Sequence, residues 1–256
     1  MSNTERVDTS LFREEHYLGK PADDTDLIIK RRIRILSEQS GFLQKDADCI
    51  EIGCGGGATI NEVAQSFHYC LGIDIFDYQK EFEQQRSKWN NTNCDFRIVN
   101  LEKESLSQTF QRIISFEVIE HFQEEGTVQK YFDLLDPGGL AAISVPNKWW
   151  IFETHGAKLP LLPWNRVPFF SWLPRPLHER WANARIYTRK RICRLMEKHG
   201  FKVKTCVYVT APMDVLKQGP LKRFLQKYIF KNDRTNNPFL STAIFVLLEK
   251  PMHPNG

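Results

Sequence analysis

Apolar runs and helical patterns alternate along the first 146 residues of the chain. Short continuous apolar runs bounded by polar or glycine-containing segments are typical of buried strands. They predict strands at 49–52, 69–73, 96–99, 112–116 and 140–145. Helical patterns lie at 27–36, 58–66 and 124–135, and Pro137-Gly138-Gly139 ends the last of these. Such an order of elements predicts a parallel sheet with helices on both faces.

Regular patterning returns near residue 187. Thr188 is placed to cap a helix with apolar positions at Ile192, Leu195 and Met196, and Gly200 ends it. An alternating run at 201–209 and an apolar run at 242–248 predict two further strands. We therefore expect a Rossmann-like, doubly wound α/β fold with a mostly parallel, seven-stranded sheet. Ligands of such sheets bind at the carboxyl ends of the strands.

The stretch between the fifth predicted strand and Thr188 has a different composition. It holds five of the six tryptophans, which are Trp149, Trp150, Trp164, Trp172 and Trp181. We expect an aromatic-rich, irregular insertion at 148–186. A single domain of residues 1–256 would then consist of a core at about 27–147, this insertion, and a C-terminal part of the sheet at 187–250.

Composition narrows the class of protein. Hydrophobic residues make up 41% of the chain and charged residues 26%, as is typical of globular proteins. No apolar run approaches the ~18 residues of a membrane span, and the start of the chain lacks the layout of a secretory signal. The six cysteines include no Cys-x-x-Cys pair, which argues against a disulfide framework and a thiolate zinc site. We expect a cytoplasmic protein with reduced core cysteines.

The net charge of the chain says less about its partners than the composition says about its class. A net charge of +4 is too small to require a nucleic-acid partner. Basic residues nevertheless crowd the stretch 185–234. Such crowding is typical of a solvated basic face, and contact with an anionic membrane surface or a phosphorylated substrate is the alternative.

A glycine-rich turn follows the first predicted strand, in Glu51-Ile52-Gly53-Cys54-Gly55-Gly56-Gly57. The glycines let a ligand lie against the backbone, where a Cβ atom would obstruct it. With Ala58 the turn also fits a dinucleotide fingerprint, so the glycines alone indicate either a nicotinamide cofactor or S-adenosylmethionine. Glu51 favours the second, because it suits a cationic methionine amino group or a structuring contact and would repel a pyrophosphate. Asp74, 21 residues after Gly53, is placed to accept hydrogen bonds from ribose hydroxyls.

These residues resemble the class I S-adenosylmethionine-dependent methyltransferases, whose first motif is an acidic residue followed by alternating glycines. The segments 116–121 and 135–139 match the same family, and the likeness covers about 27–147, with weaker likeness through Glu249. The resemblance implies S-adenosylmethionine as the cofactor. The residues implied to bind it are Glu51, Gly53, Cys54, Gly55, Gly57, Asp74, Ile75, Asn100, Leu101 and Phe116. Asn100 departs from the family, which commonly has Asp where the chain meets adenine.

The segment Ser115-Phe116-Glu117-Val118-Ile119-Glu120-His121 resembles that of the ubiquinone-biosynthesis O-methyltransferases and the small-RNA 2′-O-methyltransferases. Both groups use its two glutamates and histidine around a divalent metal. The resemblance implies Glu117, Glu120 and His121 as ligands of Mg²⁺, Mn²⁺ or Zn²⁺, and His121 and Glu117 as catalytic residues. A helical turn would place the two glutamates on one face with His121 beside them.

His121 has two chemical roles open to it. A hydroxyl is a poor nucleophile until it loses a proton, and either a neutral histidine or a bound metal promotes that loss. The structural alternative is that the histidine packs under the cofactor and a glutamate caps a helix. His178, 57 residues beyond His121, is the candidate for a further metal ligand, because the small-RNA enzymes use a downstream histidine at a similar separation. His155 competes for the same role. Each is also typical of an ordinary surface or pocket histidine.

The insertion at 148–186 is expected to fold over the open side of the cofactor as an acceptor lid. Its aromatic residues, flanked by Arg166 and Arg175, suit an apolar or sugar-stacking pocket, with a buried aromatic cluster as the alternative. They also suit a peripheral membrane contact through 149–175. We expect O-methylation of an amphipathic small molecule, which is a phenolic quinone precursor, a lipid or a lipid-linked saccharide.

Three other functions use a similar turn. An RNA 2′-O-methyltransferase would stack bases on the aromatic residues and meet phosphates with the basic helix 189–194, but no recognisable RNA-binding module is attached. A noncatalytic protein with the same fold would bind the cofactor and regulate a partner, and the uninterrupted glycines argue against such decay. A nicotinamide oxidoreductase is disfavoured by Glu51 and by the lack of an evident Tyr-x-x-x-Lys motif.

Overall fold

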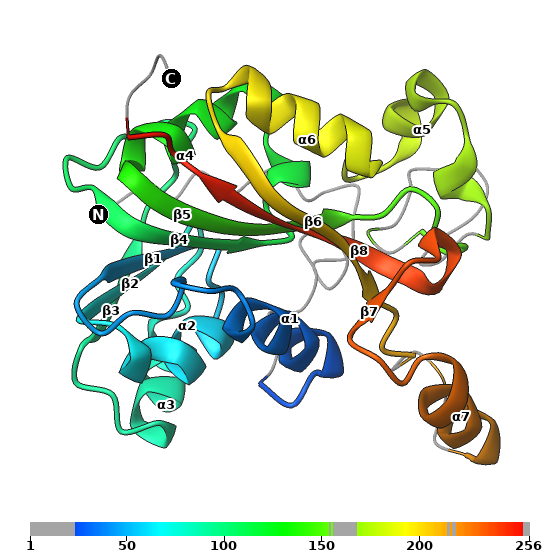
Figure 1. The fold of residues 1–256 in the computed structure, drawn as a ribbon, viewed down its shortest axis with the longest axis horizontal. Coiled ribbons are helices and arrows are strands. Elements are labelled where there is room, and N and C mark those ends of the chain that lie inside the picture. The colour runs from blue at the N-terminus through cyan, green and yellow to red at the C-terminus, as the bar shows by residue number, and fades with distance from the viewer. Residues whose placement is uncertain (1–23, 154, 156–167, 214–215, 217–218, 253–256) are drawn as a thin grey trace.

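The computed structural model describes residues 24–153, 155, 168–213, 216 and 219–252. Within them, eight strands form one sheet in the order β3-β2-β1-β4-β5-β8-β6-β7 (Figure 1). The strands are β1 (Asp48–Ile52), β2 (Tyr69–Asp74), β3 (Cys94–Ile98), β4 (Phe110–Phe116), β5 (Leu135–Pro146), β6 (Lys202–Thr210), β7 (Arg234–Thr235) and β8 (Ser241–Glu249). The first five are parallel, and β8 pairs antiparallel with β5 and β6. Since β1 lies between β2 and β4, the ligand-binding switch point of the sheet lies beyond the ends of β1 and β4.

Helices cover both faces of this sheet. They are α1 (Leu27–Ser37), α2 (Ala58–Val63), α3 (Gln79–Lys88), α4 (Gln129–Leu134), α5 (Arg175–Trp181), α6 (Arg189–Lys198) and α7 (Pro220–Phe224). Three shorter turns matter below: η3 (Ile119–His121), η4 (Glu125–Val128) and the π-helical turn η6 (Leu225–Ile229). Helices α1, α2 and α3 lie on one face, and α4 and α6 lie on the other (Figure 1).

Successive side chains of the central strands enter two different hydrophobic clusters. In β2, Leu71 and Ile73 belong to the cluster that includes Ile192 of α6, whereas Cys70 belongs to the cluster that includes Ile33 of α1. Strand side chains point alternately to the two faces, so a sheet covered on both faces is apolar at every position. This is why these strands appear in the sequence as continuous apolar runs.

The predicted α/β class and parallel core are confirmed. The prediction of a wholly irregular insertion is wrong, because α5 lies within it, and α7 also lies where no helix is predicted. The sheet has eight strands rather than seven, because the two-residue strand β7 pairs with the end of β6. A strand of this length is too short to form an apolar pattern. The pattern also misses α3, whose only buried residue is Phe82, so this helix lacks the apolar stripe that identifies one.

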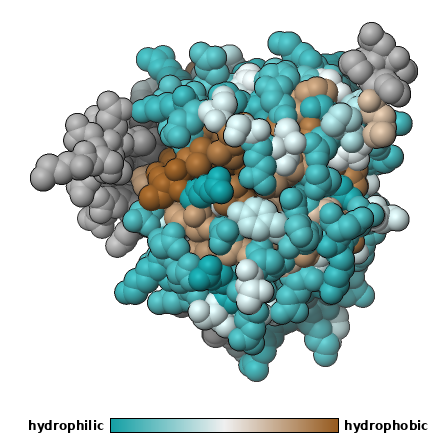
Figure 2. Space-filling view, turned by 90° about the vertical axis from the view of Figure 1, so that its left-hand side faces the viewer, coloured by the Kyte–Doolittle hydropathy of each residue, from teal (hydrophilic) through white to brown (hydrophobic). Residues whose placement is uncertain are grey.

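The expected core position of the cysteines holds for four of the six. Cys49, Cys54, Cys70 and Cys94 are buried thiols, whereas Cys193 and Cys206 are half-buried, and all six are free. Figure 2 shows the left-hand side of Figure 1, where most side chains are hydrophilic around an elongated apolar patch. Within the described part of the chain, no helix has the length and apolar character to cross a membrane.

Arg31 of α1 is buried and anchors the chain on either side of α7. Its guanidinium donates to the carbonyl oxygens of Thr210 at 2.9 Å and Asn232 at 3.2 Å, and also to that of Phe230. Hydrogen bonds from a charged donor are stronger than neutral ones. One side chain of α1 therefore fixes the connection between β6 and β7 to the sheet.

We expect Arg31→Met to lower the free energy of unfolding by about 3 kcal/mol, because several buried carbonyl oxygens lose their donor. Urea unfolding followed by circular dichroism measures this loss. The control is Arg34→Met, which removes an exposed ion pair with Asp233 and should cost less than about 1 kcal/mol. Equal losses in the two variants would contradict the anchoring role.

Candidate active site

The glycine turn between β1 and α2 has three residues in the left-handed backbone region. The φ angle is +71° at Gly53, +50° at Gly55 and +76° at Gly57, values that side chains with a Cβ atom rarely adopt. A Cβ atom at Gly53 would lie 2.3 Å from Cγ2 of Val118, and one at Gly57 would lie 2.4 Å from the ring of Phe82. The turn therefore requires glycine at both places, and it lies directly against the segment 117–121.

Glu51 is buried behind this turn. Its Oε2 accepts a hydrogen bond from the backbone N–H of Ile60 at 2.9 Å, so the side chain satisfies a donor in the first turn of α2. Burial raises the pKa of Glu51 to about 8, although hydrogen bonds from Ile60 and Thr59 oppose the rise. The structuring contact that the sequence allows is thus present. Contact with a methionine amino group stays a prediction.

Asp74, at the end of β2, lies beside the glycine turn. Its Oδ2 accepts from the backbone N–H of Gly55 at 2.9 Å, and its Oδ1 accepts from Phe76 at 3.0 Å. Burial raises the pKa of this carboxyl group, and the backbone hydrogen bonds act in the opposite direction. Ile75, the next residue, is 42% exposed. Contact of Asp74 and Ile75 with the cofactor stays a prediction.

The remaining predicted cofactor residues lie at neighbouring strand ends. Asn100 follows Val99, whose N–H donates to the carbonyl of Asp74 at 2.9 Å, and its own Oδ1 accepts from the N–H of Glu102. Cys54, Leu101 and Phe116 are buried. The ring of Phe116 lies 5.6 Å from the guanidinium carbon of Arg32, so this position packs in the core beneath the site.

Glu117 links the end of β4 to α1 and β5. It has a φ angle of +59° and precedes the helical turn η3, which holds Glu120 and His121 but not Glu117. The predicted shared helical face is therefore wrong for Glu117. Its Oε1 accepts from Arg32 at 2.8 Å and from the hydroxyl of Ser144 at 3.0 Å. Neither partner is suggested by the sequence, because both are distant along the chain.

Glu120, His121 and His155 form a compact cluster next to Glu117. Each offers a ligand atom within 4.8 Å of the others, and the rings of His121 and His155 are 5.3 Å apart between centroids. Nε2 of His155 lies 3.6 Å from Glu120 and 3.9 Å from Oε2 of Glu117. The structure thus brings His155 to the predicted glutamates and histidine. It places His178 elsewhere, buried and bonded to Glu153 at 2.8 Å.

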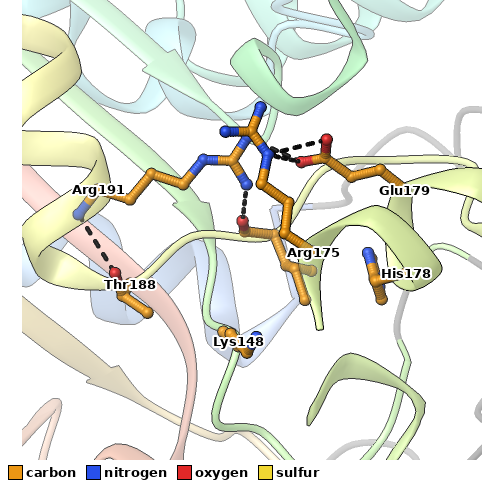
Figure 3. Close-up of a pocket in the computed structure, with 7 residues that line it drawn as sticks. Lys148, Arg175, His178, Glu179, Thr188 and Arg191 are labelled. Carbon is orange, nitrogen blue, oxygen red and sulfur yellow. Dashed lines mark hydrogen bonds and ion pairs between the residues drawn. The ribbon is translucent and has the colours of Figure 1, made fainter. Parts of the chain in front are cut away.

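An ion network holds the described part of the insertion 148–186, for which a role as acceptor lid stays a prediction (Figure 3). Arg175 of α5 donates to both carboxylate oxygens of Glu179 at 3.0 Å. Arg191 of α6 pairs with Glu179 at 2.8 Å and with Glu125 at 2.7 Å. A cavity of about 130 Å³ beside these groups also meets Lys148. Since Glu179 of α5 pairs with Arg191 of α6, the network connects the insertion to α6. Both arginines are paired with carboxylates.

The aromatic residues of the lid are divided between interior and surface. Trp150 and Phe170 are buried, whereas Phe169 and Trp172 are partly exposed. Trp164 and Arg166 lie outside the described residues. The sequence predicts either a pocket lining or a buried aromatic cluster for this insertion. Neither prediction describes all of its aromatic residues, because some are buried and others are partly exposed.

A doubly wound sheet with a glycine turn and an acid at the end of β2 defines a protein that binds a nucleoside cofactor. Residues 25–205 match the family described as Methyltransferase domain. The chain belongs to this family and is an S-adenosylmethionine-dependent methyltransferase.

Curated relatives agree with this assignment. The ubiquinone biosynthesis O-methyltransferase of Pseudomonas fluorescens is 26% identical over 180 residues, which cover 64% of this chain and 75% of that protein. The enzyme of the same name from Rhizobium etli is 26% identical over 132 residues. That match spans about half the length of the relative, 51%.

Solved structures share the fold. An S-adenosylmethionine-dependent methyltransferase from Mesorhizobium loti superimposes with a TM-score of 0.59 at 14% identity, over 88% of this chain and 99% of its own. The N-methyltransferase NodS from Bradyrhizobium japonicum, in complex with S-adenosyl-L-homocysteine, has a TM-score of 0.55 at 13% identity over 98% and 100% of the two chains. The second likeness spans nearly the whole of both chains.

The raised pKa of Glu51 predicts a pH-dependent stability of the protein without cofactor. Between its ordinary value of 4.5 and about 8, the folded protein holds a proton that the unfolded chain releases, so stability falls as pH rises. We expect unfolding free energy to drop by about 2 kcal/mol more in the wild type than in Glu51→Gln between pH ~5 and ~7. Urea unfolding at several pH values tests this, and parallel pH profiles would refute it.

Asp74→Ala should weaken binding of S-adenosylhomocysteine by about 100-fold, because the hydroxyls of the ribose lose a charged acceptor. Isothermal titration calorimetry measures the affinity. Asp95→Ala removes a more exposed carboxylate of β3 and should leave it unchanged. A similar affinity in both variants would exclude the predicted ribose contact.

Proposed function

We propose that this enzyme transfers the methyl group of S-adenosylmethionine to a hydroxyl oxygen of an amphipathic small molecule. The observation that carries the proposal is the cluster of Glu120, His121 and His155, which adjoins Glu117 and, through Val118, the glycine turn. A hydroxyl acceptor must lose a proton as it attacks, and such a cluster suits that requirement. In-line attack also needs donor and acceptor to be held in alignment.

His121 is better suited to bind a cation than to take the proton itself. Burial, His155 and Arg185 lower its pKa to about 3. A general base works best when its pKa lies near the working pH, so this imidazole accepts a proton weakly. Its neutral ring keeps a nitrogen lone pair, which is the form that binds metals.

The carboxyl group of Glu120 supports the same role. Among the described residues, its oxygens accept no hydrogen bond from an N–H group or a hydroxyl group, which is unusual for a buried carboxyl group; its neighbours are the carboxyl group of Glu117 and Nε2 of His155 at 3.6 Å. Burial and the neighbouring Glu117 raise its pKa, and a cation would favour its ionised form.

The donor set therefore fits a divalent metal. Glu117, Glu120, His121 and His155 would hold Mg²⁺, Mn²⁺ or Zn²⁺, for which mixed carboxylate and imidazole ligands are suitable. A bound ion of this kind would lower the pKa of the acceptor hydroxyl. Arg32 and Ser144 orient Glu117 through its Oε1, which leaves Oε2 directed toward His155.

The acceptor is most consistent with an amphipathic compound that has an apolar part. Trp149, Trp150 and Phe152 of the lid line an apolar groove, and aromatic side chains of this kind bind rings and apolar chains. The name of the curated relatives refers to ubiquinone biosynthesis. We therefore propose a phenolic quinone precursor, a lipid or a lipid-linked saccharide as the acceptor class.

His121→Ala and His155→Ala should each weaken Mn²⁺ binding by more than about 10-fold, because each removes a proposed ligand. Calorimetric titration of Mn²⁺ into the protein saturated with S-adenosylhomocysteine measures this without an acceptor. His68→Ala changes an exposed histidine bonded to Asp48 and serves as the control. Unchanged binding in both cluster variants, or methyl transfer that survives extensive chelation, would overturn the metal role.

The acceptor class is tested with methyl-labelled S-adenosylmethionine and a mixed panel of catechols, lipid extracts, saccharides and short RNA. We expect label in the catechol or lipid fraction. Label confined to RNA would instead support a 2′-O-methyltransferase. Cofactor binding without transfer to any fraction would support a noncatalytic binding protein.

A further inference from the structure

α7 and the π-helical turn η6 present large apolar side chains to solvent. Leu221, Phe224 and Tyr228 are 64%, 54% and 59% exposed, and Ile229 is 45% exposed. The rings of Phe224 and Tyr228 lie 5.1 Å apart between centroids. In Figure 1, α7 projects from the body of the protein at the lower right. Clustered exposure of this kind marks a contact surface, because isolated apolar residues are common on surfaces but groups of them are not.

An apolar groove joins this helix to the acceptor lid. It has a volume of about 500 Å³, and its lining includes Trp150, Trp172, Leu225, Ile229 and Phe239. The rings of Trp172 and Phe239 are 5.5 Å apart between centroids, and both residues are partly exposed. The helix and the lid aromatics therefore form one continuous apolar face.

Cationic residues flank the same face. Arg223, Lys227 and Lys231 are exposed, and the sequence from Gly219 to Asn232 contains no acidic residue. The ammonium group of Lys227 lies 5.3 Å from the ring centroid of Tyr228. Asp233, the next acid along the chain, pairs with Arg34 of α1 at 2.6 Å. The surface around α7 is thus locally positive.

We propose that α7 and η6 dock this enzyme on an anionic lipid bilayer. Leu221, Phe224 and Tyr228 would lie in the headgroup layer, with the cations directed to lipid phosphates. A short amphipathic helix with aromatic and basic residues is the arrangement with which peripheral proteins bind the membrane interface. Association of two copies through this face would bring like charges together, which disfavours a dimer as its occupant.

This surface differs from the one that the sequence predicts. The membrane contact expected at 149–175 includes Trp150 and Phe170, which are buried. α7 lies outside that range and supplies both the exposed apolar side chains and the charge. The lid contributes the neighbouring aromatics Trp172 and Phe169, so the groove opens on the docking face and an apolar molecule could enter it from the bilayer.

Co-sedimentation of the full chain with vesicles tests the proposal. Vesicles of phosphatidylcholine with about 30% phosphatidylglycerol should bind the protein, and vesicles of phosphatidylcholine alone should bind it much more weakly. The double variant Leu221→Glu/Phe224→Glu should lose at least about 10-fold in partition. The triple variant Arg223→Gln/Lys227→Gln/Lys231→Gln should lose roughly 100-fold, since each cation near an anionic surface contributes about 5-fold.

Two matched control variants carry the same kinds of substitution at sites away from α7 and η6. Met252→Glu changes an equally exposed apolar residue, 66%, that lies near Gly138, away from α7. Lys45→Gln/Lys190→Gln/Lys198→Gln removes the same charge from other exposed positions. Both controls should retain most of the binding, and circular dichroism should show that all variants are folded.

Three results would overturn the proposal. The first is equal loss of vesicle binding in the test and control variants, and the second is no preference for anionic vesicles. The third is a dimer in sedimentation velocity that Phe224→Glu dissociates while vesicle binding is absent, which would assign this face to self-association. The measurement uses neither cofactor nor acceptor, so its failure is distinct from a failure of the proposed O-methylation.

Discussion

The close approach of Gly53 to Val118 sets the geometry at the carboxyl ends of the central strands. A Cβ atom on the glycine would lie 2.3 Å from the valine methyl group, so the turn after β1 and the segment after β4 touch without room for another side chain. Val118 therefore lies between the cofactor turn and η3, which holds Glu120 and His121. A transfer reaction depends on this proximity, because alignment of the reacting groups supplies much of its acceleration.

Two successive arginines of α1 connect this region to the rest of the molecule. Arg32 donates to Oε1 of Glu117 at 2.8 Å, whereas Arg31 binds the carbonyl oxygens on either side of α7. The side chains of successive residues in a helix point in directions about 100° apart, so α1 can contact both Glu117 and the carbonyl oxygens beside α7. The position of Glu117 and the position of the docking surface are thus fixed by the same rigid element.

Much of the fold and of the cofactor site could be predicted from the sequence because the signals are local. Gly53 and Gly57 need a left-handed backbone, and Asp74 ends the second strand at the spacing that is typical of a nucleoside site. The contacts of Glu117 with Arg32 and Ser144 could not be predicted, because they join elements distant in sequence. Likewise, spacing could not decide between His155 and His178. The structure separates them, because His155 lies 3.6 Å from Glu120 and His178 is buried against Glu153.

The insertion 148–186 and α7 both lie in connections between strands, which affects how the acceptor specificity of such an enzyme can change. The lid follows β5, and α7 lies between β6 and β7, so both are connections whose replacement would leave the order and register of the sheet intact. Such connections tolerate change more readily than strands do. The segments of the candidate donor site belong to the parallel core of the sheet, and the segments that we propose to contact the acceptor belong to these replaceable connections. Duplicated copies of such a gene can therefore acquire new acceptors without rebuilding the donor site.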